Sequence, residues 1–132
     1  MPQSGPRPGA ALQTIAMPAD TNANGDIFGG WLMGQMDLGA SVLARGLAEG
    51  RVATVAVESM LFHHPVRVGD VVSIFPSVAT LGRTSMTLDV EVRIFNAESG
   101  AERRVAECRI VFVAIDRDGR PRPLPGREAA QG

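Results

Sequence analysis

The stretch "DTNANGDIFGGWLMGQMDLGAS", residues 20–41, decides how the rest of the chain must fold. It opens with turn-forming residues, places the carboxylate of Asp26 before the glycine pair Gly29 and Gly30, and then becomes amphipathic. Apolar side chains recur there at the three- and four-residue spacing of one helical face, at Leu32, Met36, Ala40, Leu43 and Leu47. We therefore predict one long helix over residues 30–48, ended by Gly50.

The predicted helix contains two internal glycines, Gly34 and Gly39. Each glycine inside a helix costs about 1 kcal/mol relative to alanine. Small residues at these positions are explained if another part of the backbone must approach the helix closely. We expect the helix to be enclosed on more than one side.

After the helix the hydrophobic period changes from about four residues to two, which is typical of β-strands. The pattern predicts strands over residues 52–61, 70–81, 84–95 and 104–116, with a short strand over residues 12–17 before the opening motif. Pro76 indicates a sheet edge or a bulge, because proline cannot donate to the ladder. One long helix against about five antiparallel strands predicts an α+β fold.

The last predicted strand is apolar on both faces. We expect its inward set to be Ala106, Cys108, Ile110 and Phe112, while the opposite face carries Val111, Val113 and Ile115. A single helix can cover only one of these faces. The sequence therefore predicts that the other face meets a second subunit.

Composition narrows the class of protein. The 132 residues allow one domain, which we place at residues 11–117 between Pro/Gly-rich tails at 1–10 and 118–132. The net charge of −1 does not favour a nucleic-acid or anionic membrane partner. No apolar run predicts a signal peptide or a membrane span. The single cysteine cannot form an internal disulfide or a thiolate metal site, so we expect a reducing cytoplasm and no metal.

Three segments resemble a known family: "MPADTNANGDIFGGWLMGQMDLGA", "VATVAVESMLFHHPVRVGDVVS" and "LGRTSM". They are similar to the YciA-like bacterial acyl-CoA thioesterases over most of the span from Met17 to Asp118. The resemblance implies a hotdog fold, with a long helix wrapped by a curved antiparallel sheet. It also implies hydrolysis of acyl-CoA to free acid and CoA without a cofactor, and a homohexamer built as a trimer of dimers. The family's catalytic aspartate falls on Asp26.

Asp26 itself admits two interpretations. It is a common type of turn or helix-capping residue. Alternatively, it serves a thioester hydrolase, which needs a base or nucleophile near the carbonyl carbon and N–H donors near its oxygen. The start of a helix offers such donors, and Gly29 and Gly30 would let a substrate approach them. Asp26 would activate water or attack directly, and Asn24 would orient the water or the carboxylate.

Further residues are candidates for contact with the substrate. Arg83 is predicted to contact a phosphate of CoA, and Thr84 or Ser85 the pantetheine amides, because the resembling family has its CoA site near this region. Arg51 is a weaker candidate of the same kind, and Phe28 and Trp31 are assigned to substrate binding. Trp31 can equally be a core residue.

The histidines His63 and His64 are expected to be exposed turn residues rather than metal ligands, because neighbours in an extended stretch point apart. Two other functions remain as alternatives: an acyl-thioester dehydratase or hydratase, and a non-catalytic acyl-CoA-binding sensor. The first usually pairs a histidine with an acid, and neither histidine lies in a motif of that type. The second would need an added DNA-binding segment or partner domain.

Overall fold

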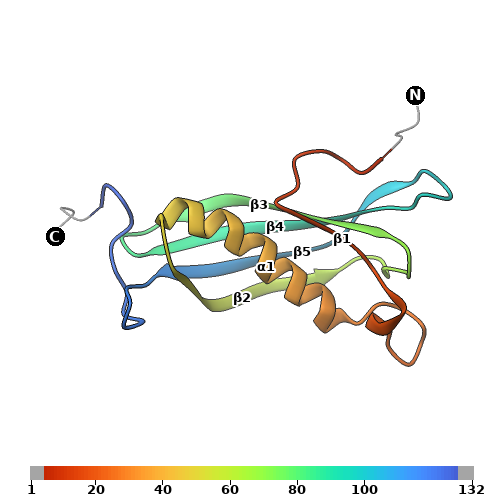
Figure 1. Ribbon diagram of the computed structural model, residues 1–132, viewed down its shortest axis with the longest axis horizontal. Helices are drawn as coiled ribbons and strands as arrows, with labels where there is room; N and C mark the ends of the chain where they lie inside the picture. The colour runs from red at the N-terminus through yellow and green to blue at the C-terminus, as the bar shows by residue number, and fades with distance from the viewer. Residues whose placement is uncertain (1–4, 128–132) are drawn as a thin grey trace.

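The computed structural model describes residues 5–127 (Figure 1). The elements follow in the order β1 (Leu12–Ile15), the short 3-10 helix η1 (Pro18–Asp20), α1 (Gly29–Ala48), β2 (Val52–Phe62), β3 (Val71–Leu81), β4 (Ser85–Phe95) and β5 (Glu102–Ala114). The predicted helix and five strands are confirmed, and each boundary shifts by no more than two residues. None of the helices among these residues is long and apolar enough to cross a membrane.

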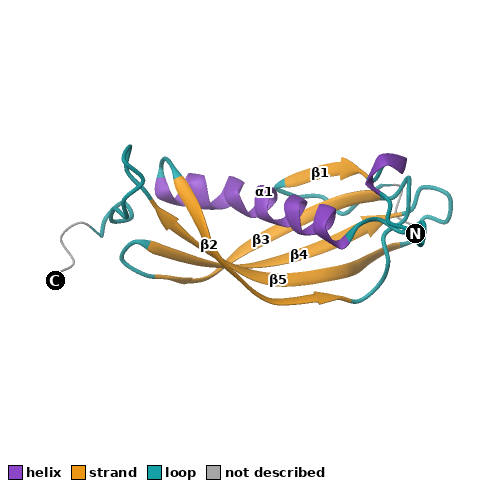
Figure 2. Cartoon of the chain, turned by 90° about the horizontal axis from the view of Figure 1, so that it is seen from below, coloured by secondary structure: helices purple, strands orange, loops and turns teal. Residues whose placement is uncertain are grey.

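All five strands form one antiparallel sheet in the order β1-β3-β4-β5-β2. The helix α1 lies along one face of this sheet, and no helix covers the other face among the described residues (Figure 2). The short edge strand β1 pairs with β3 only from Val71 to Ile74. Beyond Ile74, β3 has no partner strand on this side within the described chain and becomes the edge of the sheet. Pro76 lies in this unpaired part, as expected for a residue that has no N–H group to donate.

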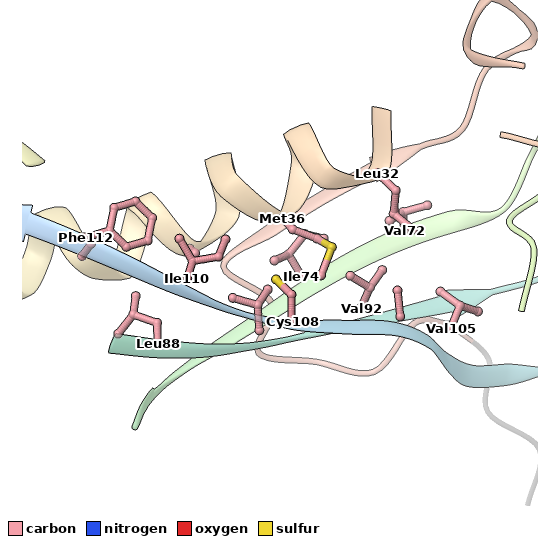
Figure 3. Packing of buried hydrophobic residues seen from close by; sticks show 14 of the residues in the cluster. Leu32, Met36, Val72, Ile74, Leu88, Val92, Val105, Cys108, Ile110 and Phe112 are labelled. Carbon is pink, nitrogen blue, oxygen red and sulfur yellow. The ribbon is translucent and has the colours of Figure 1, made fainter. Parts of the chain in front are cut away.

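The core lies between α1 and the inner face of the sheet (Figure 3). Met36 and Ile74 are completely buried there, and the apolar residues that alternate along β4 are all buried as well: Met86, Leu88, Val90, Val92 and Ile94. A Cβ atom on Gly39 would lie 2.6 Å from Cγ2 of Ile74. This glycine therefore permits a close approach, although the approaching group is a side chain and not backbone. Gly34 has no such neighbour within 4 Å.

The strand β2 departs from the alternation that the sequence predicts. Its pairing with β5 shifts register between Thr54 and Ala56 and again between Glu58 and Leu61, and Ser59 has a positive φ of 54°. As the outer edge of the sheet, β2 also leaves large apolar side chains exposed, at Val55, Val57, Leu61 and Phe62. The opposite face of β5, at Val111, Val113 and Ile115, is only partly covered.

The C-terminal end of α1 is covered by residues 116–127. Glu49, one residue before the predicted stop at Gly50, takes the left-handed conformation that ends the helix. Arg122 then donates from Nη2 to the carbonyl oxygen of Ala48 at 3.0 Å, and the amide of Leu124 donates to the carbonyl oxygen of Arg83 at 2.8 Å.

Leu124 is 3% exposed and belongs to the core. Up to Arg127, the segment that the sequence suggested as a surface tail is therefore packed onto the fold. At the other terminus, Arg7 contacts Glu91 at 3.4 Å and lies over the ring of Phe75. Residues 1–4 and 128–132, which the predicted tails include, lie outside the described residues.

Candidate functional site

The loop that carries Asp26 is organised by the side chain of Asn22. Its Oδ1 atom accepts hydrogen bonds from the backbone amides of Asn24 at 2.8 Å and Asp26 at 3.2 Å. The amide of Asn22 donates in turn to the carbonyl oxygen of Asp26 at 2.7 Å, and Gly25 supplies the positive φ of 82° that closes the turn. The local sequence "NANG" therefore holds the backbone of Asp26 in one place.

Two backbone hydrogen bonds then tie this loop to its surroundings. The amide of Ile27 donates to the carbonyl oxygen of Val66 at 2.9 Å, and the amide of Phe28 donates to that of Asp20 at 2.8 Å. Ile27 is buried, while Asp26 is half-buried. The loop presents the Asp26 side chain at the boundary between the core and solvent.

Asp26 is not the cap of α1. The residue that precedes the helix is Phe28, and no side chain donates or accepts a capping hydrogen bond there. The amides of the first turn have no partner inside a helix. Gly29 and Gly30 are exposed, and a Cβ atom on Gly30 would meet no heavy atom of the described residues within 4 Å. The backbone at the start of α1 is therefore exposed, and the role of the paired glycines in substrate approach stays a prediction.

A pocket of about 260 Å³ opens beside this helix end. Its lining combines the Asp26 loop and the start of α1 with the segment that follows β2: Asp26, Ile27, Gly29, Leu32, Phe62, His63, His64, Pro65 and Val66. The ring of Phe62 reaches within 3.6 Å of the position of a Cβ atom on Gly29. The pocket thus has apolar walls and a carboxylate, next to backbone N–H groups that carry the positive end of the helix dipole.

The remaining residues predicted near Asp26 lie around this pocket without lining it. Asn24 is exposed and uses its backbone amide, not its side chain, in the hydrogen bonds among the described residues. Phe28 is 55% exposed, whereas Trp31 is partly buried against the core. The structure therefore favours the core interpretation of Trp31 within a single chain.

Arg51 and the segment Arg83–Ser85 lie at the opposite end of α1. Arg51 lies between α1 and β2, and the carbonyl oxygens of Arg51 and Thr84 accept hydrogen bonds from the adjacent amides of Ile115 and Ala114. The turn between β3 and β4 lies at this end of the helix in Figure 1. The helix has 20 residues, which span about 30 Å at 1.5 Å per residue. Arg51 donates to the carbonyl oxygens of Asp116 and Arg117 at 3.2 and 3.1 Å. One chain therefore does not bring the proposed CoA-binding residues to Asp26. A single site that uses both groups must combine two chains.

A second carboxylate, which the sequence pattern did not single out, is that of Asp37. It is half-buried on the side of α1 that faces β2, where Thr54 donates from Oγ1 to its Oδ1 at 2.6 Å. Burial raises the pKa of the Cys108 thiol to about 11, and the charges of Asp37 and Asp89 contribute. The sequence does contain a hint of a special role for Asp37, because it is the only charged residue between Gly29 and Ala44.

None of the described residues form a group of three His, Cys, Asp or Glu side chains that could hold a metal ion. His63 and His64 are both exposed in the segment after β2, as expected, but His63 also forms a side-chain contact. Its Nε2 atom lies 2.6 Å from Oε2 of Glu107 on β5.

Comparisons with known proteins agree with this architecture. The model of the thioesterase superfamily matches residues 24–101. The chain is 52% identical over 117 residues to the acyl-CoA thioester hydrolase YciA of Salmonella typhimurium, which covers 86% of this chain and 88% of the relative.

Two solved structures are also similar. The hexameric thioesterase y2039 from Yersinia pestis has a TM-score of 0.85 and 47% identity over 93% of this chain and 100% of its own. The hexameric broad-specificity acyl-coenzyme A thioesterase HI0827, in a form with one aspartate replaced by alanine, has a TM-score of 0.87 and 47% identity over 91% and 88% of the two chains. The chain described here therefore belongs to the thioesterase superfamily, among the hotdog-fold acyl-CoA thioesterases that include YciA.

Proposed function

We propose that this chain hydrolyses acyl-CoA thioesters to a carboxylic acid and CoA, with a carboxylate as general base or nucleophile. The observation that carries the proposal is the pocket in which Asp26 lies beside the uncapped start of α1. The relatives named as acyl-CoA thioester hydrolases support the substrate class. Coenzyme A is then part of the substrate and product, and the reaction uses no cofactor.

In this mechanism the thioester carbonyl lies against Gly29 and Gly30. Their N–H groups stabilise the oxyanion that forms when the carbonyl carbon becomes tetrahedral, and the positive end of the helix dipole adds to this effect. Asp26 removes a proton from the attacking water or attacks the carbonyl carbon itself to give an acyl anhydride, which water then opens. The thiolate of CoA leaves in either route.

Asp37 is the competing candidate for the same role. It is held in place by Thr54 on β2, the edge strand where a second chain would complete a cleft. Asp37 thus lies at the edge where a second chain would pair, whereas Asp26 lies in a pocket of one chain that would need the Arg83–Ser85 end of a second chain to bind CoA.

We also propose that the protein assembles through β2, as a dimer at least and as a hexamer in the form of its relatives. The outer edge of β2 has no neighbouring strand among the described residues and exposes Val55 and Val57, which are 56% and 43% exposed. Pairing two such edges would place the Arg83–Ser85 end of one chain nearer to the Asp26 end of the other. A solution mass of 13.9 kDa, that of one chain, at micromolar concentration contradicts this assembly.

A panel of acyl-CoAs of increasing chain length, with release of the free thiol monitored, tests the activity. We expect thiol and carboxylic acid in equal amounts. Hydration or dehydration of an acyl-CoA without thiol release would indicate the dehydratase alternative, and binding without any turnover would indicate a sensor. We propose a cytoplasmic location because the only cysteine, Cys108, is a buried free thiol. Fractionation of expressing cells checks that location.

A further inference from the structure

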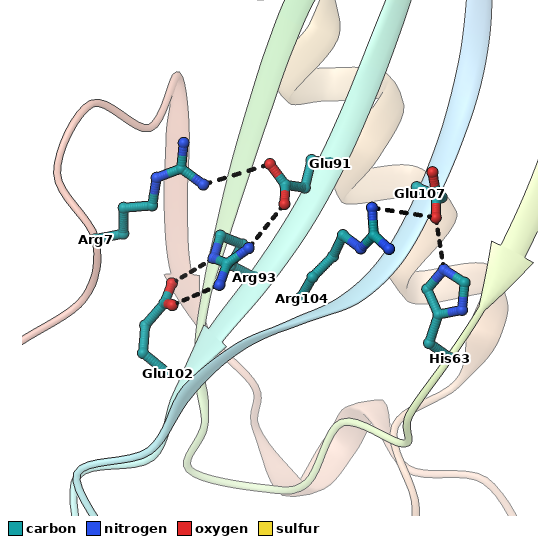
Figure 4. A network of polar contacts seen from close by, with 7 residues as sticks. All are labelled: Arg7, His63, Glu91, Arg93, Glu102, Arg104 and Glu107. Carbon is teal, nitrogen blue, oxygen red and sulfur yellow. Dashed lines mark hydrogen bonds and ion pairs between the residues drawn. The ribbon is translucent and has the colours of Figure 1, made fainter.

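The wall of the pocket opposite α1 is attached to the sheet by the side chain of His63. This wall consists of residues 62–66, the last residue of β2 and the four that follow it. Nε2 of His63 lies 2.6 Å from Oε2 of Glu107, and Nη1 of Arg104 lies 3.4 Å from the same oxygen (Figure 4). Glu107 and Arg104 both belong to β5, so the side-chain contact joins the pocket wall to a central strand of the sheet.

Backbone hydrogen bonds extend this attachment on both sides of the wall. The amides of His63 and His64 both donate to the carbonyl oxygen of Val105, at 2.7 and 3.2 Å. At its other end the wall accepts the hydrogen bond from Ile27 on the carbonyl oxygen of Val66. Because Ile27 follows Asp26 directly, the wall is a continuous mechanical link between β5 and the Asp26 loop.

The pair between His63 and Glu107 contributes little to global stability. Its side chains are 33% and 36% exposed, and ion pairs at such sites contribute about 0–1 kcal/mol. His64 provides a natural comparison, because it lines the same pocket but forms no side-chain hydrogen bond within residues 5–127. An effect of His63 that His64 does not share would therefore come from the link to Glu107.

We propose that His63 is a positioning residue, which holds residues 62–66 against the Asp26 loop and so fixes the separation between the pocket wall and Asp26. This role rests on the proposed hydrolysis at the pocket. The ring of Phe62, which lies over Gly29, belongs to the same wall and moves with it. Catalysis is sensitive to such positioning, since a misplacement of 1 Å can cost about 10²-fold in rate.

Three variants test the role in the full-length protein: His63→Ala, His63→Gln and His64→Ala. We expect kcat to fall about tenfold in His63→Ala, within the range for a displacement below 1 Å, while the melting temperature stays near that of the parent. Glutamine can donate to Glu107 through its amide nitrogen, so His63→Gln should recover most of the rate. Equal losses in His63→Ala and His64→Ala, or no loss in either, would overturn the proposal.

Exchange of the Ile27 amide with deuterium gives a second readout that does not depend on activity. In His63→Ala the loosened wall should let this amide exchange about tenfold faster, with no change in His64→Ala. Unchanged exchange in both variants contradicts the positioning role even if the protein hydrolyses acyl-CoA. If the parent protein hydrolyses no acyl-CoA but the Ile27 amide still exchanges faster in His63→Ala, the mechanical link is supported and the proposed function is rejected.

Discussion

The two ends of α1 are built in opposite ways. At the C-terminal end the carbonyl groups are occupied: Glu49 and Gly50 close the last turn, and the guanidinium of Arg122 donates to Ala48. At the N-terminal end no side chain caps the helix, and Gly29 and Gly30 leave the amides exposed. Unpaired amides cost stability unless water or a ligand pairs with them. The closed end therefore contributes to stability, whereas under the proposed mechanism the open end is the one that contacts the substrate.

Replacement of the carboxylate at the open end should have the largest effect. Asp26→Asn should lower kcat by about 10²- to 10⁴-fold, because the amide can neither accept the proton of water nor attack the carbonyl. The melting temperature should change little, since the carboxylate accepts no hydrogen bond within the described part of the chain. Initial rates of thiol release and a thermal melt measure the two quantities.

Asp37→Asn is the matched comparison for that experiment. If Asp37→Asn loses the rate and Asp26→Asn keeps it within a few-fold of the parent, the base is Asp37 and the open end of α1 serves only to bind. The asparagine at 37 can still accept the hydrogen bond from Thr54 through its side-chain oxygen, so its folding should be preserved.

Gly30→Val keeps the backbone N–H group but places a branched side chain where the thioester would lie. We expect kcat/KM to fall by about 10²- to 10³-fold, the range for loss of one oxyanion donor, because the carbonyl could no longer reach that donor. A Cβ atom at position 30 meets no heavy atom of the described residues within 4 Å, so a packing clash within the chain would not explain the loss of activity. Gly34→Val is the control, because that glycine also has no neighbour within 4 Å but lies one turn further along the helix. Parallel losses of activity and melting temperature in both variants would show that these glycines serve packing between subunits instead.

Gly39→Val should affect stability instead of access to the helix end. Its Cβ atom would lie 2.6 Å from Ile74, and overpacking of this kind costs about 1–3 kcal/mol. Urea denaturation of the parent and the variant gives the difference in the free energy of unfolding. A variant as stable as the parent would mean that α1 can shift away from β3 at little cost.

Arg122→Ala should have the smallest effect, about 1 kcal/mol of unfolding free energy with kcat unchanged. The arginine donates to Ala48 and, through Nε, to the carbonyl oxygen of Ile115 at 3.0 Å. Arg120→Ala removes a neighbouring arginine whose side chain forms no hydrogen bond within residues 5–127, and should be neutral. A loss of activity in Arg122→Ala at constant stability would place function at the closed end as well.

The sequence predicted the elements well because burial imposes its period on the chain. One face of β4 packs against α1, so apolar and polar side chains alternate from Met86 to Ile94, and this alternation predicts a strand. In β2 the simple alternation does not hold at Ser59, which has a positive φ. A bulge at a sheet edge changes which side chains point inward, and the pattern of apolar residues does not reveal it.

The site was harder to predict for a different reason. The glycine pair and Asp26 are adjacent in the sequence, so their proximity follows from the chain itself. The distance between Asp26 and Arg83 depends on the order and direction of the strands that separate them in the chain. The sequence around either residue does not reveal this. Asp37 was missed because a single carboxylate in a helix reads as a solvent-facing residue until Thr54 is seen to bind it.

The two edges of the sheet differ in how well each could pair with a strand of another copy of the chain. On the β1 side, the strand is only four residues long and Pro76 interrupts donation along the exposed part of β3. On the β2 side, an eleven-residue strand offers its edge without a proline. If two chains pair through β2 as proposed, a two-fold axis uses up both of these edges. The joined sheet would then end on each side at the short β1 edge, which is poorly suited to adding a further chain and so to growth into a fibre.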